Sequence, residues 1–227
     1  MNKLFAFLYL LFLIAAIGCN NNRKDAPPKQ KEAVKNTAAN DSSREKKTIV
    51  FFGNSLTAGY GVDPSEAYPA LIQNIIDSLH LNYKVINAGV SGETSAGGNG
   101  RIDWILRQPV DVFVLELGGN DGLRGIPLSE TKKNLQAIIK KVKSKYPQAK
   151  IVLEGMQIPP NMGQQYATEF KNIYPHIAKE DTVAIVPFLL KDVGGDAKLN
   201  QADGIHPTAE GHKIVAKNVW NVLKDLL

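Results

Sequence analysis

The chain has a single cysteine, Cys19, among its 227 residues, so no intramolecular disulfide can form within it. Histidine is also scarce, with four copies, and no two of them have the spacing of a zinc site. No acidic run has the pattern of a calcium-binding loop. The sequence therefore gives no reason to expect a metal or any other cofactor.

A hydrophobic run long enough to span a bilayer, about 20 residues, is not evident either. The apolar stretch from Leu4 to Ile17 is shorter and follows Lys3, which predicts a secretory signal peptide over residues 1–18. It ends in Ala15-Ala16-Ile17-Gly18-Cys19, which resembles a bacterial lipobox, although Ala16 stands where leucine is usual. We expect a lipid anchor on Cys19 and a place in the bacterial cell envelope, facing periplasm or cell surface. The alternative is an ordinary signal peptide followed by an incidental cysteine.

Large apolar side chains are almost absent from residues 20–47, which contain Asn20-Asn21-Asn22, Pro27-Pro28 and many lysines. Such a composition buries too little surface to fold, so residues 19–47 are predicted to form a disordered tether. Lys3 and this segment carry the chain's whole net charge, because residues 48–227 hold 18 basic and 18 acidic residues. A nucleic-acid-binding domain should carry its own basic face, so nucleic acid is not an expected partner. The tether lysines suit either anionic lipid head groups or a solvated spacer.

Residues 48–227 alternate short apolar runs with amphipathic helical patterns. The strand-like runs are nearly continuous in Val, Ile, Leu and Phe, as in strands covered on both faces: Thr48–Phe52, Lys84–Ala88, Asp111–Leu117, Lys150–Glu154 and Thr182–Val186. Apolar residues at helical spacing occur in Glu66–Leu79, Ser129–Tyr146 and Thr208–Leu227. The alternation predicts one α/β domain over 48–227, with a five-stranded parallel sheet between two helical layers.

The glycine-rich stretches Gly97-Gly98-Asn99-Gly100 and Gly194-Gly195 have no phosphate-binding pattern and are interpreted as loops. The first of them is a candidate for one side of a substrate pocket. Because sites in parallel sheets form beyond the carboxyl ends of the strands, candidate functional residues should follow strands.

Ser55 is the first such candidate, since Gly53-Asn54-Ser55-Leu56-Thr57 directly follows a predicted strand. A serine in a small-residue turn at a helix start has an exposed hydroxyl, and unpaired backbone N–H groups lie beside it. Near the C-terminus, Asp203 stands three residues before His206, so its carboxylate can orient one imidazole nitrogen and leave the other free. Together these residues have the composition of an activated serine nucleophile. Taken alone, Ser55 would be interpreted as a helix cap and His206 as a loop histidine.

Two further residues follow the next strands. Gly92, in Gly89-Val90-Ser91-Gly92, lets the backbone approach a substrate oxygen, and Asn120, in Gly118-Gly119-Asn120-Asp121, can donate its amide to the same oxygen. With the Ser55 N–H they would form an oxyanion hole, in which one donor is typically worth roughly 10²–10³ in rate. Each is otherwise consistent with an ordinary turn.

The four blocks Gly53-Asn54-Ser55-Leu56, Gly92, Gly118-Gly119-Asn120-Asp121 and Asp203-x-x-His206 resemble those of the SGNH hydrolases, also called GDSL-type esterases. Asn54 replaces the aspartate of the Gly-Asp-Ser-Leu name. Gly118–Gly125 and Met156-Gln157-Ile158-Pro159-Pro160-Asn161 are similar to the branch that contains bacterial arylesterases and thioesterase I/lysophospholipase L1. The resemblance implies a flavodoxin-like α/β/α sandwich. It also implies Ser55 as nucleophile, His206 as base and acid, Asp203 as its orienting group, and Ser55, Gly92 and Asn120 as oxyanion donors.

The leading hypothesis is thus a membrane-anchored esterase that hydrolyses small acyl esters or lysophospholipids through an acyl-enzyme on Ser55. A carbohydrate O-deacetylase with the same chemistry is the alternative. Apolar residues expected near the site favour the acyl chain: Leu123, Ile126, Met156, Ile158 and Pro159. A non-catalytic envelope lipoprotein on a hydrolase fold is a third hypothesis, which the complete set of blocks argues against.

Overall fold

The computed structural model describes residues 45–159 and 163–227. The predicted signal peptide, Cys19 and nearly all of the predicted tether lie outside the described residues. So do Pro160 and Asn161, the last two residues of the Met156–Asn161 motif. Within the described ranges, no helix combines the length and the hydropathy needed to cross a membrane.

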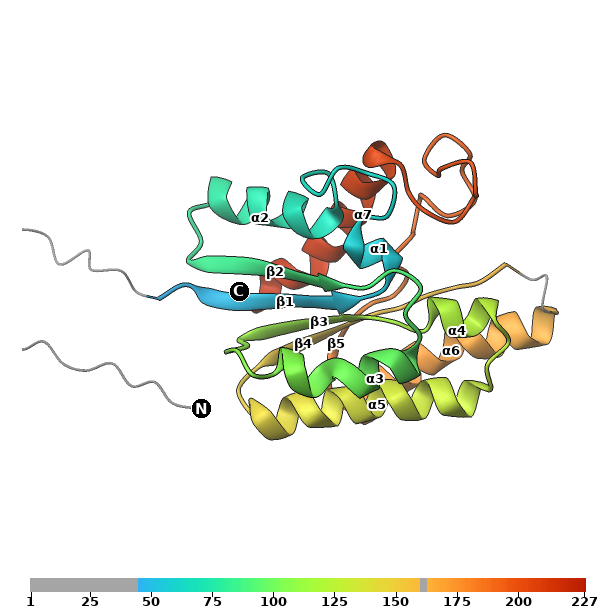
Figure 1. Cartoon of the computed structure of the whole chain (residues 1–227), viewed down its shortest axis with the longest axis horizontal. Coiled ribbons are helices and arrows are strands. Elements are labelled where there is room, and N and C mark those ends of the chain that lie inside the picture. Colours follow the sequence, from blue (N-terminus) through green and yellow to red (C-terminus); the bar gives the residue numbers. More distant parts are fainter. Residues whose placement is uncertain (1–44, 160–162) are drawn as a thin grey trace, which may run out of the picture. The chain divides into compact units, whose positions relative to one another are not determined.

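The described part of the chain is built on one parallel sheet, as the sequence predicted (Figure 1). Its strands run in the order β2-β1-β3-β4-β5, all in the same direction. Their bounds are β1 Lys47–Gly53, β2 Tyr83–Gly89, β3 Val112–Glu116, β4 Lys150–Glu154 and β5 Ala184–Val186. The second strand, β2, lies on one side of β1, and the chain then crosses to β3 on the other side. A topological switch point, where α/β sheets bind ligands, therefore lies between β1 and β3.

Helices cover both faces of the sheet (Figure 1). One face carries α1, α2 and α7, and the other carries α3, α4, α5 and α6. They span α1 Ser55–Ala58, α2 Tyr68–Ser78, α3 Ser95–Ile105, α4 Gly119–Leu123, α5 Leu128–Lys145, α6 Gln164–Glu180 and α7 Ala209–Leu223, which a 3₁₀ turn at Lys224–Leu226 extends. The side chains of β3 are all buried, which explains why its run is apolar on both faces.

Most predicted elements differ from the observed ones by a few residues at their ends, and two differences have an identifiable physical cause. The last strand begins at Ala184 rather than Thr182, because Thr182 has a left-handed backbone (φ 49°) in the turn that ends α6. The prediction of a loop at Gly97–Gly100 is wrong, since these residues lie inside α3. A Cβ on Gly98 would lie 2.3 Å from Leu117 Cδ1, so this glycine lets α3 pack close to the sheet. The helix is also fastened at its start, where Ser95 N and Oγ donate to buried Asp121.

Candidate active site

The turn that carries Ser55 is fixed by its neighbours in sequence. Ser55 begins α1 directly after β1, so its N–H has no acceptor within the helix. Asn54 caps the helix, and its Oδ1 accepts a hydrogen bond of 2.9 Å from Leu56 N. Gly53 is required for space, because a Cβ there would lie 2.1 Å from Thr57 Oγ1 and 2.6 Å from Glu116 Oε2. The small-residue turn therefore holds Ser55, the candidate nucleophile, next to the carboxyl end of β1.

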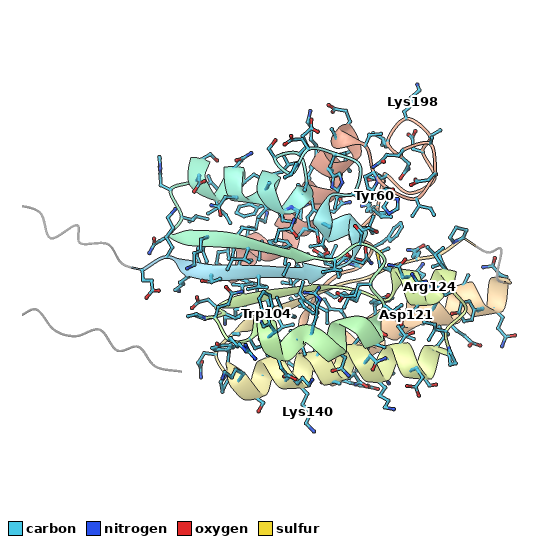
Figure 2. The ribbon with its side chains drawn as sticks, in the orientation of Figure 1. Tyr60, Trp104, Asp121, Arg124, Lys140 and Lys198 are labelled. Atoms are coloured by element: carbon cyan, nitrogen blue, oxygen red, sulfur yellow. The ribbon has the colours of Figure 1, made fainter. Side chains whose placement is uncertain are left out.

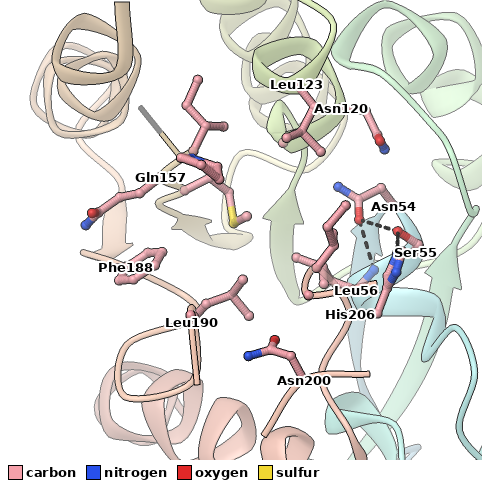
Figure 3. A pocket seen from close by; sticks show the side chains of 18 residues that line it. Asn54, Ser55, Leu56, Asn120, Leu123, Gln157, Phe188, Leu190, Asn200 and His206 are labelled. Atoms are coloured by element: carbon pink, nitrogen blue, oxygen red, sulfur yellow. Dashed lines mark hydrogen bonds between the residues drawn. The ribbon is translucent and has the colours of Figure 1, made fainter. Parts of the chain in front are cut away.

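Ser55, His206 and Asp203 form one hydrogen-bonded chain, although Ser55 and His206 are 151 residues apart. His206 Nε2 lies 2.9 Å from Ser55 Oγ (Figure 3), and His206 Nδ1 lies 2.6 Å from Asp203 Oδ2. The His206 side chain and the N–H groups of His206 and Ile205 all bond to Asp203 and lower the pKa of its carboxyl to about 2. Because Asp203 is ionised, Nδ1 carries the imidazole proton and Nε2 can accept the Ser55 hydroxyl.

The two other oxyanion candidates lie close together in the fold. Asn120, in the first turn of α4, lines the cavity around Ser55, and its Nδ2 donates one hydrogen to Glu93 O at 2.9 Å. An amide has a second hydrogen, which this bond leaves available. Gly92 stands next to Glu93 with a left-handed backbone (φ 79°), and its carbonyl accepts from Arg124 at 3.0 Å. Gly92 is not among the residues that line the cavity, in contrast to Asn120 and Ser55.

Tyr60 is a residue of the site that sequence reasoning missed. Its ring centroid lies 4.7 Å from that of His206, and Gln201 holds its carbonyl by a hydrogen bond of 2.7 Å. Figure 2 shows Tyr60 near α1 and Arg124 near α4, both toward the carboxyl ends of the strands. The tyrosine ring therefore packs against the His206 imidazole.

A cavity of about 440 Å³ opens beside Ser55 and His206 (Figure 3). Its volume is within the usual range for small-molecule sites. Most of its wall is apolar and comes from the segments that follow four strands: Leu56, Leu123, Met156, Ile158, Pro159, Phe188 and Leu190. Ile126 and Gly97–Gly100, which the sequence placed near the pocket, are not part of this wall. Phe188 and Leu190 were not predicted, because the loop after β5 has no motif. In residues 45–159 and 163–227, no three His, Cys, Asp or Glu side chains converge to hold a metal.

Two buried glutamates beneath the Ser55 turn were also missed. Glu116 ends β3 and Glu154 ends β4, both with no exposed surface. Burial raises the pKa of Glu116 to about 7, and burial together with the Glu116 charge raises the pKa of Glu154 well above its ordinary value. The sequence does contain a signal for them, because each glutamate directly follows a run of apolar residues, Val112–Leu115 or Ile151–Leu153.

A family model described as "GDSL-like Lipase/Acylhydrolase family" matches residues 51–214 of this chain. Esterase TesA of Pseudomonas aeruginosa is 40% identical over 181 residues, which are 79% of this chain and 89% of that protein. Thioesterase 1/protease 1/lysophospholipase L1 of Escherichia coli K12 is 38% identical over 79% of this chain and 85% of its own length.

Solved structures agree in fold. A crystal structure of TesA superposes with a TM-score of 0.77 at 40% identity, covering 80% of this chain and 100% of that one. The psychrotrophic esterase EstA from Pseudoalteromonas sp., in a structure inhibited by monoethylphosphonate, gives a TM-score of 0.74 at 32% identity. It covers 79% of this chain and 98% of its own.

Proposed function

Because this chain belongs to the GDSL-like lipase/acylhydrolase family and is a serine hydrolase of acyl esters, we propose that it prefers single, extended acyl chains, including those of lysophospholipids. The observation that carries the proposal is the hydrogen-bonded chain Ser55–His206–Asp203, which opens into an apolar cavity. Leu123, Met156 and Phe188 offer an acyl chain apolar contacts, whereas a sugar ring would call for more polar ones.

The mechanism follows from the positions of these atoms. Ser55 Oγ attacks the ester carbonyl while His206 Nε2 takes the hydroxyl proton, and Asp203 stabilises the imidazolium that forms. The proposed donors to the oxyanion are the N–H groups of Ser55 and Gly92 and the second amide hydrogen of Asn120. The C–O bond then breaks, and His206 returns the proton to the leaving alcohol. Water, deprotonated by the same imidazole, releases the acyl group from Ser55 and restores the free enzyme.

The acyl-chain preference can be measured with p-nitrophenyl esters from acetate to palmitate. Each methylene that enters the cavity should contribute about 0.8 kcal/mol, so kcat/KM should rise about fourfold per CH₂ until the cavity is full. Leu123→Trp places a bulky ring in the cavity and should lower kcat/KM for octanoate more than tenfold while acetate changes little. Leu79→Trp, at an exposed site after α2, is the control and should match wild type. A profile that peaks at acetate would instead support the carbohydrate O-deacetylase.

We also propose that the enzyme is held in the bacterial cell envelope by a lipid on Cys19. The sequence Ala15-Ala16-Ile17-Gly18-Cys19 supports the proposal, and the tether would join the domain at Lys47, the amino end of β1, whereas Ser55 follows its carboxyl end. Metabolic labelling with an alkyne fatty acid should mark wild-type protein in the membrane fraction. Cys19→Ser should remove the label and release the protein from membranes; equal labelling of both would exclude the anchor.

A further inference from the structure

The two buried glutamates beneath the nucleophile turn lie side by side on neighbouring strands. Leu115 of β3 pairs with Leu153 of β4, so Glu116 and Glu154 are the next residues of the same register. Within the described residues neither carboxylate forms an ion pair, and neither lines the cavity. Burying two unpaired negative charges together is expensive, so the pair needs hydrogen-bond donors, a shared proton, or both.

Glu116 has donors on both of its oxygens. Asn54 N donates to Oε2 at 2.9 Å, Asn54 Nδ2 donates to Oε1 at 2.7 Å, and Thr57 Oγ1 lies 2.9 Å from Oε2. These donors flank Ser55 in the chain on both sides. The contact with Nδ2 also fixes the Asn54 amide, whose oxygen therefore faces Leu56 N and the Ser55 hydroxyl, 3.4 Å away. The carboxylate thus sets the geometry of the turn that carries Ser55.

Glu154 is connected to Glu116 through two hydroxyl groups. The sequence of contacts is Glu116 Oε2, Thr57 Oγ1, Tyr68 OH and Glu154 Oε2, and all three separations are 2.9 Å. The two hydroxyls supply two hydrogens for three contacts. The third hydrogen has to come from a carboxylic acid at one end of the chain, since otherwise one contact would bring two lone pairs together.

The surroundings decide which glutamate carries that proton. Glu116 receives two N–H donors from Asn54, which favour its ionised form, whereas Glu154 Oε1 has no partner in the described part of the chain. We propose that Glu154 is a protonated acid donating through Tyr68 and Thr57 to ionised Glu116, and that Glu116 is a positioning residue for Ser55. The role assigned to Glu116 rests on the proposed function, while the position of the proton does not.

The other titratable groups around the pair are consistent with this assignment. Burial and the nearby glutamates raise the pKa of Tyr68 well above its ordinary value, so its hydroxyl keeps its proton. His212 of α7 stacks on the Tyr68 ring, and burial lowers its pKa to about 4, so it is uncharged near neutral pH. On the opposite face, burial also raises the pKa of Tyr174 well above its usual range. Among the described residues, no cationic side chain therefore neutralises Glu116 or Glu154.

Chemically identical substitutions at the two glutamates should have different results. In Glu154→Gln, the new amide can donate to Tyr68 OH as the acid does, so the chain of hydroxyls is preserved. In Glu116→Gln, the new NH₂ group must face either Asn54 Nδ2 or the donors Asn54 N and Thr57. In both orientations one hydrogen-bond donor faces another donor. The double variant Asn54→Asp with Glu116→Gln reverses the polarity of that contact, since the Gln amide can donate to the Asp carboxylate while its oxygen accepts from residue 54 N and Thr57.

The experiment compares these variants at pH 8 with the p-nitrophenyl ester that wild type prefers. We expect Glu116→Gln to lose at least 100-fold in kcat with KM little changed, Glu154→Gln to lose less than tenfold, and the double variant to recover at least tenfold over Glu116→Gln. Urea unfolding of each variant identifies losses due to misfolding. Equal losses at both glutamates, or no recovery in the double variant, would overturn the positioning role.

Infrared spectroscopy in deuterated buffer locates the proton independently of turnover. The carbonyl stretch of a buried carboxylic acid should be present in wild type and absent in Glu154→Gln. Its persistence in Glu154→Gln would overturn the assignment of the proton. If wild type shows the band but hydrolyses no ester, the proposed function fails while the proton assignment stands.

Discussion

Ser55→Ala is expected to lower kcat by about 10⁴- to 10⁶-fold, because it removes the oxygen that is placed to form the acyl-enzyme. Ser55 Oγ is the hydroxyl that His206 Nε2 approaches, at 2.9 Å. Binding contacts and oxyanion donors remain, so KM should change little and a small residual rate over water should persist. The measurement is hydrolysis of the preferred ester on residues 45–227, together with covalent labelling by a fluorophosphonate.

Ser129→Ala is the matched control for that variant. Ser129 is an exposed serine in the first turn of α5 and does not line the cavity, so its loss should leave rate and labelling unchanged. Undiminished labelling in Ser55→Ala would show that another nucleophile reacts. Equal background hydrolysis in wild type and Ser55→Ala would favour the non-catalytic lipoprotein.

Asp203→Asn is expected to have the second largest effect. An asparagine amide facing His206 Nδ1 favours the tautomer in which Nε2 carries the hydrogen, and that nitrogen can no longer accept the Ser55 proton. A buried aspartate in this role is worth about 10⁴ in kcat. Since the Asp203 side chain is 38% exposed, water can partly replace it, and we expect a loss of about 10³.

The pH dependence tests the same assignment. Hydrogen bonds lower the pKa of Asp203 to about 2, so its orienting charge is fully present above that value and would be lost only as the pH falls through it. The ratio of wild-type to variant kcat should therefore be constant from about pH 6 to about pH 9. Asp196→Asn is the control, because Asp196 also accepts a backbone N–H two residues on, from Lys198 at 2.8 Å, and does not itself line the cavity. A similar loss in both variants would assign the effect to loop stability.

Much of the fold could be predicted because parallel strands buried on both faces leave continuous apolar runs. The central strands β1 and β3 illustrate this, since nearly all of their side chains are buried. The helix α3 could not be predicted, because its sequence is rich in glycine and poor in helical propensity. Its stability depends on contacts distant in sequence, such as the packing of Gly98 against Leu117 and the bonds from Ser95 to Asp121.

The residues of the triad could be predicted, but the pocket only in part. Ser55 stands after a strand, and Asp203 and His206 are close in sequence, so local patterns reveal them. Phe188 and Leu190 lie in a loop without a motif, and they belong to the pocket only because β5 ends at the same edge of the sheet as β1. The buried pair was missed because a glutamate at a strand end has no fixed partner until its neighbouring strand is known.

The sequence by itself determined which chemical groups follow which strands, and therefore the family, the fold and the candidate nucleophile Ser55. Alternation of strands and helices is a local property, and it places all strand ends at one edge of the sheet. Only the tertiary structure decided three features: the distance from His206 Nε2 to Ser55 Oγ, the composition of the apolar cavity wall, and the contacts between Glu116 and Asn54. The physical reason is that these contacts join groups far apart in the chain, 62 residues for Asn54 with Glu116 and 151 for Ser55 with His206, and their geometry is set by packing between layers.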